Sequence, residues 1–279
     1  MIWRLKRVIK YALGNDIAGR NLTVYADDTF VVSYPRSGNT WTRFLVANLI
    51  HPEEQATFAN IEQFIPDCEA MSSRYVKRVP RPRIIKSHQC FDSRYRRVIY
   101  MARDPRDVVV SQYHLHRKRN LIADQFPLSE FVGRFLAGQT CLYGSWGEHV
   151  ASWLTTRHGQ PGFLLLRYED MIDNTAHELS KVDSFLGLTT SPHSIMQAVE
   201  RSSADTMRQL EKLQGQLFTS TKDTRQDIPF VRTAKPGGWR SELTEECARQ
   251  IDEAWGDLMQ RLGYEPFATG AVGRHVNCA

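Results

Sequence analysis

The sequence predicts an α/β fold: a single three-layer domain with a mainly parallel central sheet and helices on both faces. Three observations predict it: four short apolar runs suit buried strands, helical patterns separate them, and the first run leads into a P-loop-like turn. The 279 residues are 42% apolar with a formal net charge of +5, which is ordinary for a globular domain. That charge suits an anionic ligand, a membrane surface or nucleic acid equally well.

The predicted strands are apolar at consecutive positions rather than at alternating ones. This pattern is typical of a parallel sheet that is covered on both faces. The runs are TFVVSY, RIIKS, RVIYMA and FLLLRY, at residues 29–34, 83–87, 97–102 and 163–168. Such sheets bind ligands beyond the carboxyl ends of their strands, so the residues after each strand are the first candidates for a site.

Helical spacing fills the stretches between and after the strands. Residues 39–51 follow the first strand, and a helix after the third strand has Asp104 as its N-cap and Pro105 in its first turn. Further helices are expected at residues 129–138, 143–156 and 245–264. We find no repeat and no linker, so one domain over residues 1–279 is expected, with a tail at about 265–279.

The N-terminal stretch MIWRLKRVIKYALG predicts an amphipathic helix, which we place at residues 1–20. Its apolar face carries Ile2, Leu5 and Ile9, and its other face is basic. Two hypotheses stay open: the helix packs on the protein's own core, or residues 1–13 lie in a membrane interface.

The number of cysteines and the hydropathy of the chain indicate the cellular compartment of the protein. The five cysteines are odd in number and form no CxxC pair, so neither a disulfide framework nor a zinc site is expected. No apolar run is long enough to span a bilayer, and no signal peptide is recognisable. We therefore predict a cytoplasmic protein, with peripheral membrane contact as an open alternative.

The turn YPRSGNTW, residues 34–41, follows the first strand. Gly38 allows a ligand to approach the backbone, and the backbone N–H groups of residues 37–41 stand at a helix N-terminus, where anions bind. Arg36 adds a positive charge. A single glycine is also compatible with an ordinary strand–helix turn, so this loop alone does not establish a site.

Reactive residue types follow the other strands. Lys86 and His88 are two residues apart, so in an extended chain their side chains share a face; a histidine can act as general base beside a charge-stabilising lysine. Arg103 ends the third strand, with Ser111 two helical turns further on. Each of these residues also has an ordinary structural explanation, such as a salt bridge from Arg103 to a nearby aspartate.

Several segments together resemble the PAPS-dependent sulfotransferases of the soluble, cytosolic type, where PAPS is 3′-phosphoadenosine 5′-phosphosulfate. The resemblance extends from about residue 30 to residue 239 and beyond. YPRSGNTW is similar to the phosphosulfate loop and KSH to the catalytic segment. The segments VIYMARDPRDVVVSQYH, LLLRYEDM and FVRTAKPGGWR are similar to those that bind the 3′-phosphate and the adenine.

The resemblance implies in-line transfer of a sulfuryl group from PAPS to an acceptor hydroxyl or amine, which leaves adenosine 3′,5′-bisphosphate (PAP) and needs no metal. It implies that His88 is the general base and that Lys86 and Arg36 stabilise charge. The implied cofactor-binding residues are Arg36, Ser37, Gly38, Asn39, Thr40, Trp41, Arg103, Ser111, Tyr168, Ser202, Met207, Arg232, Thr233 and Ala234.

The chain departs from the family pattern at a few positions of the cofactor site. Arg36 stands where the family often has lysine, so the positive charge at this position is kept. Thr233 and Ala234 stand where it commonly has lysine and glycine, so Lys235 is a candidate to supply the missing cation. Ala204 replaces an aromatic residue that packs on the adenine.

Two alternatives belong to other functional classes. A nucleotide-dependent phosphotransferase on a similar fold is disfavoured because the loop lacks G-x-x-x-x-G-K-[ST]. A non-enzymatic, membrane-peripheral binding protein with a decayed site is disfavoured by the intact Lys86, His88, Arg103 and Ser111.

The acceptor is expected to be a small molecule, a glycan or a lipid-linked group rather than nucleic acid. Its identity should be determined by the loop stretches 56–82, 115–129 and 210–228. The chain is a monomer or a homodimer.

Overall fold

The computed structural model describes residues 13–267; residues 1–12 and 268–279 lie outside the described part of the chain. Four parallel strands form one sheet in the order β2-β1-β3-β4. Val31 pairs with Lys86 on one side and with Ile99 on the other. The central place of β1 puts the loop after it between the ends of β2 and β3, where α/β sheets bind ligands. The strands are β1 (Thr29–Ser33), β2 (Ile84–Ser87), β3 (Arg97–Ala102) and β4 (Phe163–Arg167).

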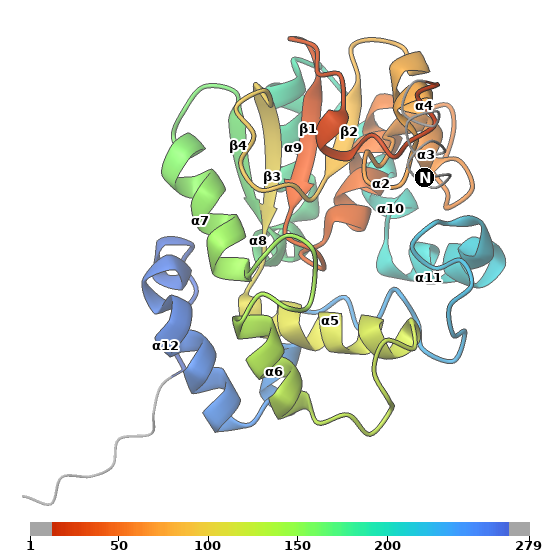
Figure 1. Ribbon diagram of the computed structural model, residues 1–279. Coiled ribbons are helices and arrows are strands. Elements are labelled where there is room, and N and C mark those ends of the chain that lie inside the picture. Colours follow the sequence, from red (N-terminus) through yellow and green to blue (C-terminus); the bar gives the residue numbers. More distant parts are fainter. Residues whose placement is uncertain (1–12, 268–279) are drawn as a thin grey trace, which may run out of the picture.

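Two hydrophobic cores lie on opposite faces of the sheet, which confirms the predicted three layers (Figure 1). Phe30 and Tyr100 point into one core, and their neighbours Val31 and Ile99 point into the other. The first core is covered by α5 (Pro105–Lys118), α6 (Leu128–Leu136), α7 (Trp146–Arg157) and α12 (Glu245–Arg261). The second is covered by α2 (Asn39–Ile50), α8 (Tyr168–Asp173), α9 (Thr175–Leu186), α10 (Pro192–Arg201) and α11 (Ala204–Gln214).

The helix starts differ in a way that matters for the site. The Asp104 side chain accepts a hydrogen bond from the Arg106 N–H at the start of α5, as the sequence predicted. Ser145 and Glu148 form a capping box at the start of α7. By contrast, α2 follows Gly38 without any side-chain cap. Its first N–H groups therefore remain available to a ligand.

The sequence predicted the strands within one residue at each end, but several helices were missed. These are α3 (Ile61–Phe64), α4 (Ser73–Arg78) and the four helices α8–α11. In α11 Met207 is the only buried residue, and the Ser203 side chain caps the start of the helix. The short helices α3 and α4 have one buried residue each and give little periodic signal, whereas α9, α10 and α11 are 12, 10 and 11 residues long and were overlooked.

The predicted N-terminal helix does not reach residue 20. Residues 13–18 contain a turn, with Gly14 at φ 66°, and an isolated bridge between Ile17 and Ser72. A 3-10 turn follows at η1 (Gly19–Asn21). The first twelve residues of that prediction lie outside the described part. Within residues 13–267, no helix is both long enough and apolar enough to cross a membrane.

Candidate active site

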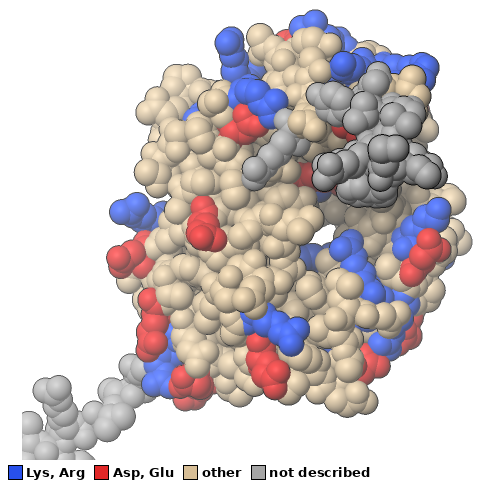
Figure 2. All heavy atoms as spheres, in the orientation of Figure 1, with Lys and Arg blue, Asp and Glu red and all other residues tan. Residues whose placement is uncertain are grey.

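A cavity of about 760 Å³ lies at the carboxyl ends of the strands. It brings together residues that follow β1, β2 and β3 with others from the 140–143, 202–207, 218–220 and 230–242 stretches. In Figure 2 the surface is hollowed between the regions of α5 and α11, and Lys and Arg atoms border the opening. Of the predicted site residues, all but Ser37 line this cavity. Ser37 is buried, with 1% of its surface exposed.

The loop after β1 has an unusual backbone. Arg36 and Gly38 both have positive φ, 73° and 102°. A Cβ atom on Gly38 would lie 2.7 Å from Cδ2 of Tyr168, so the space requires glycine. This tight turn carries the chain into the uncapped start of α2. The loop is therefore shaped as the sequence predicted for a phosphate-binding turn.

Arg36 is turned toward the start of α5 and the 230–242 stretch. Its Nε donates to Oγ of Ser111 at 2.9 Å, and Nη2 donates to the carbonyl of Phe230 at 3.1 Å. Burial, followed by the charges of Arg103 and other arginines, lowers the pKa of Arg36 to about 9. A partly buried cation among like charges would gain stability from a bound anion.

Arg103 lies beside the same loop. Its guanidinium stacks 4.1 Å from the centre of the Tyr168 ring, and Nη1 donates to the carbonyl of Arg36 at 3.4 Å. The carboxylate of Asp107 is 3.8 Å away, a loose ion pair. Nε of Arg103 is buried and has no hydrogen-bond partner among the described residues. An unpaired buried donor beside an uncapped helix start is the arrangement expected of an anion site.

Asp107 and Glu242 place the 230–242 stretch over this site. Asp107 accepts hydrogen bonds from the backbone N–H groups of Gly237 and Trp239 at 2.7 and 3.0 Å. Arg232 donates to Glu242 at 2.8 Å. Burial alone would raise the pKa of Glu242, but hydrogen bonds from His114 and Arg232 lower it to about 2. Of the other predicted residues, Thr233, Ala234 and Lys235 line the cavity as well.

Aromatic and small residues line another part of the same cavity. Trp41 packs edge-on against Tyr168, with ring centres 5.7 Å apart, and its Nε1 donates to the carbonyl of Ser202 at 2.9 Å. The hydroxyl of Ser202 accepts a hydrogen bond from Asn48 on α2. Met207 is buried nearby and lines the same cavity. The structure thus brings together Trp41, Tyr168, Ser202 and Met207, which the sequence predicted to bind the cofactor.

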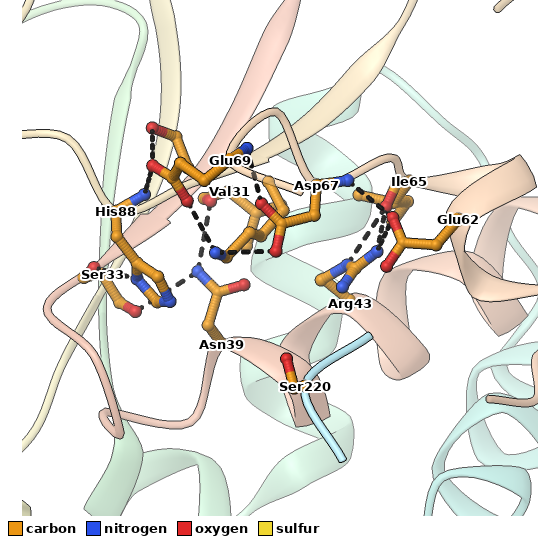
Figure 3. A network of polar contacts seen from close by, with 12 residues as sticks. Val31, Ser33, Asn39, Arg43, Glu62, Ile65, Asp67, Glu69, His88 and Ser220 are labelled. Carbon is orange, nitrogen blue, oxygen red and sulfur yellow. Dashed lines mark hydrogen bonds and ion pairs between the residues drawn. The ribbon is translucent and has the colours of Figure 1, made fainter. Parts of the chain in front are cut away.

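His88 stands in a tautomer suited to accept a proton. Its Nδ1 lies 2.7 Å from the carbonyl oxygen of Ser33 (Figure 3). Because a carbonyl oxygen can only accept, Nδ1 carries the hydrogen and Nε2 keeps its lone pair in the neutral ring. Burial, followed by the positive charge of Lys86, lowers the pKa of His88 well below 6.5. The imidazole is therefore neutral at physiological pH.

Lys86 lies between two carboxylates that the sequence reasoning missed. Its Nζ is 3.0 Å from Asp67 and 2.7 Å from Glu69 (Figure 3). Burial opposes a charge on Lys86, but the two acids outweigh it and raise the lysine pKa. The segment of Asp67 runs beside β2, with the Lys86 N–H donating to the carbonyl of Pro66 at 2.9 Å. Nothing in the local sequence, IPDCEA, marks this pairing.

The comparison with known proteins identifies the chain. Residues 26–263 match the family model described as "Sulfotransferase domain". The chain belongs to this family. It is 30% identical over 250 residues to a 3-beta-hydroxysteroid sulfotransferase of Cavia porcellus, a match that covers 86% of this chain and 85% of the relative. It is 28% identical over 252 residues to sulfotransferase 2A1 of Homo sapiens, covering 86% of this chain and 87% of that protein.

Solved structures show the same fold. A retinol dehydratase in complex with androsterone and the inactive cofactor PAP superposes with a TM-score of 0.75 at 22% identity, covering 87% of this chain and 83% of that one. Mouse sulfotransferase SULT7A1 complexed with PAP gives 0.69 at 24% identity, covering 87% and 88%. The predictions of family, enzyme class and fold are confirmed. The family match favours a sulfotransferase over the phosphotransferase and the non-enzymatic alternatives.

Proposed function

We propose that this sulfotransferase transfers a sulfuryl group from PAPS to a hydroxyl, or an amine, of a small acceptor molecule, with His88 as general base. The observation that carries the proposal is that one cavity is lined by an uncapped helix start, by partly buried arginines and by the neutral His88. Two solved structures with the same fold contain PAP, the nucleotide left after PAPS gives up its sulfuryl group.

The donor half of the cavity fits a nucleotide that carries two phosphate groups. It consists of the loop at residues 36–41, Arg103, Ser111 and Arg232. The unpaired Nε of Arg103 and the lowered pKa of Arg36 are both features that an anionic ligand would relieve. We assign the N–H groups of residues 37–41 to the 5′-phosphate, and Arg103, Ser111 and Arg232 to the 3′-phosphate. Trp41 and Tyr168 would hold the adenine.

The chemistry requires one proton acceptor and positive charge. His88 Nε2 takes the proton of the acceptor hydroxyl while the acceptor oxygen forms its bond to sulfur. The bond from sulfur to the bridging oxygen breaks, and the electron pair stays on the leaving PAP. Arg36 and Lys86 supply positive charge for that oxygen and for the sulfuryl oxygens. A sulfuryl group carries less charge than a phosphoryl group, so the reaction is expected to proceed without a metal.

The acceptor half lies around His88 and Tyr143, whose ring centres are 5.6 Å apart, and includes residues 218–220. The Cavia porcellus relative is named a 3-beta-hydroxysteroid sulfotransferase. A glycan or a lipid-linked acceptor stays a second hypothesis, as does membrane contact through residues 1–13. We also propose a cytoplasmic location; a Danio rerio relative with 28% identity is named a cytosolic sulfotransferase. The chain is predicted to be a monomer or a homodimer.

The test is transfer of labelled sulfur from PAPS in EDTA to a panel of phenols, steroid alcohols and amines. The wild type should transfer, and His88→Asn should lose roughly 10²- to 10⁴-fold in rate. Asparagine retains a donor for the Ser33 carbonyl, so PAP affinity should not change. Near-normal turnover of His88→Asn would place the base elsewhere. Transfer of phosphate from ATP, dependent on magnesium, would replace the proposal by the phosphotransferase alternative.

A further inference from the structure

The Glu69 carboxylate contacts three successive residues, Lys86, Ser87 and His88, at the end of β2 (Figure 3). Oε2 of Glu69 accepts from Nζ of Lys86 at 2.7 Å, and Oε1 accepts from Oγ of Ser87 at 3.1 Å. Oε1 also accepts the backbone N–H of His88 at 2.5 Å. Glu69 thus binds the backbone of the proposed base and the side chain of the proposed cation at once.

The surroundings make these contacts consequential. Only 11% of the Glu69 side chain and 8% of the Lys86 side chain are exposed. In such a site a charge without its partner costs far more than on the surface, so the pair constrains both groups strongly. The contact with His88 is charge-assisted and short, which is the stronger kind of hydrogen bond.

The other contacts of His88 leave Glu69 a distinct role. His149 on α7 lies 2.9 Å from the His88 carbonyl and donates through Nε2, while its Nδ1 is 3.0 Å from the Tyr100 hydroxyl. Ser33 orients the ring. The backbone of His88 is therefore held at its carbonyl by α7 and at its N–H by Glu69. Losing either contact would free the base to turn.

We propose that Glu69 is a positioning residue of the transfer reaction, whose ionised carboxylate fixes both His88 and Lys86. This rests on the proposed function, because it takes His88 as the base. Asp67 shares only part of the role: its carboxylate reaches Lys86 and the Glu69 N–H, but not His88. Glu62, in the same cluster, binds Arg43 and the Asp67 N–H and contacts neither catalytic residue.

A consequence for pH dependence follows from the groups that face Glu69. These are Asp67, Lys86, His88, Cys68, Tyr95 and Tyr143. Burial, together with Asp67, raises the pKa of Glu69 against the lowering effect of Lys86, whereas burial lowers that of His88. These opposite directions of shift favour proton uptake by Glu69 rather than by His88 as pH falls from neutrality. The acidic limb of kcat should report Glu69.

The experiment compares wild type, Glu69→Gln and the matched control Glu62→Gln in the full chain, by sulfuryl transfer from PAPS, by PAP binding and by thermal melting. Glutamine keeps the shape but not the charge. We expect kcat of Glu69→Gln to fall roughly 10- to 100-fold, the scale of a misplaced catalytic group, and its acidic limb to move. PAP affinity should stay within about twofold, and Glu62→Gln should keep the wild-type kcat, acidic limb and PAP affinity, whatever its melting temperature.

The outcomes separate the two proposals. A wild type that transfers no sulfuryl group overturns the proposed function and this inference with it. A wild type that transfers, beside a Glu69→Gln variant with normal kcat and an unmoved acidic limb, overturns the inference alone. If Glu69→Gln does not fold, NMR of the wild type decides: the His88 ring should stay neutral across the acidic limb of kcat. Protonation of that ring over the same limb would assign the limb to His88 and reject the role of Glu69.

Discussion

The two halves of the cavity balance their charges in opposite ways. In the donor half Arg36 pairs with a neutral hydroxyl, and Arg103 has a loose ion pair with Asp107 and an Nε without a hydrogen-bond partner among residues 13–267. In the acceptor half Lys86 lies between two carboxylates, and His88 has partners for its ring and for its backbone. The positive charge of Arg36 and Arg103 is therefore available to the phosphates of a ligand, whereas Lys86 and His88 in the acceptor half already have partners within the protein.

This difference suggests how the two halves work. A site with excess positive charge gains affinity from every phosphate group that enters it. A site whose polar groups are already satisfied holds its reactive groups in place before any ligand arrives. Substitutions in the donor half should therefore change binding, and substitutions in the acceptor half should change rate or pH dependence.

The largest expected effect in the donor half is on the 3′-phosphate. Arg103→Ala should weaken PAP binding by roughly 1.5–3 kcal/mol, the value of one hydrogen bond to a charged group. That range corresponds to about 10- to 100-fold in Kd. Binding of AMP, which lacks the 3′-phosphate, should change far less. Calorimetry with both nucleotides checks this, with Arg240→Ala as the control, since Arg240 is exposed and lies outside the cavity lining. An equal loss for both nucleotides would break the assignment.

The two halves also differ in how far the sequence predicts them. Arg36, Arg103 and Tyr168 directly follow strands, so the rule for parallel sheets located the donor half correctly. Asp67 and Glu69 lie in the stretch 56–82, which has no strand or long-helix pattern and reaches Lys86 through a single bridge. Sequence spacing shows which residues share an element, but not which distant segment packs beside it. The acids of the acceptor half could therefore not be predicted.

A smaller expected effect concerns the pH dependence of folding stability at His149, which hydrogen-bonds the backbone of His88. Burial lowers the pKa of His149 from 6.5 to about 4. A depressed histidine pKa means that the unfolded chain binds the proton first, so stability is lost as pH falls below 6.5. By linkage His149 costs roughly 1 kcal/mol on going from about pH 8 to about pH 5.5.

Denaturant unfolding at these two pH values measures that loss. His149→Gln can keep both hydrogen bonds, so it should show a shallower loss of stability, while His88 continues to contribute in the same direction. Replacement of the exposed His193 by glutamine is the control and should leave the difference between the two pH values as in the wild type. An unchanged pH dependence in His149→Gln would mean that His149 does not titrate as its burial requires.

The most direct test of the central claim is calorimetric titration of the wild-type protein with PAP and with AMP in EDTA. If the donor half is a metal-free site for a nucleotide with a 3′-phosphate, PAP should bind at least about tenfold more tightly, because at least one charged hydrogen bond separates the two ligands. Equal affinity for PAP and AMP, or binding of PAP only with added magnesium, would contradict the account.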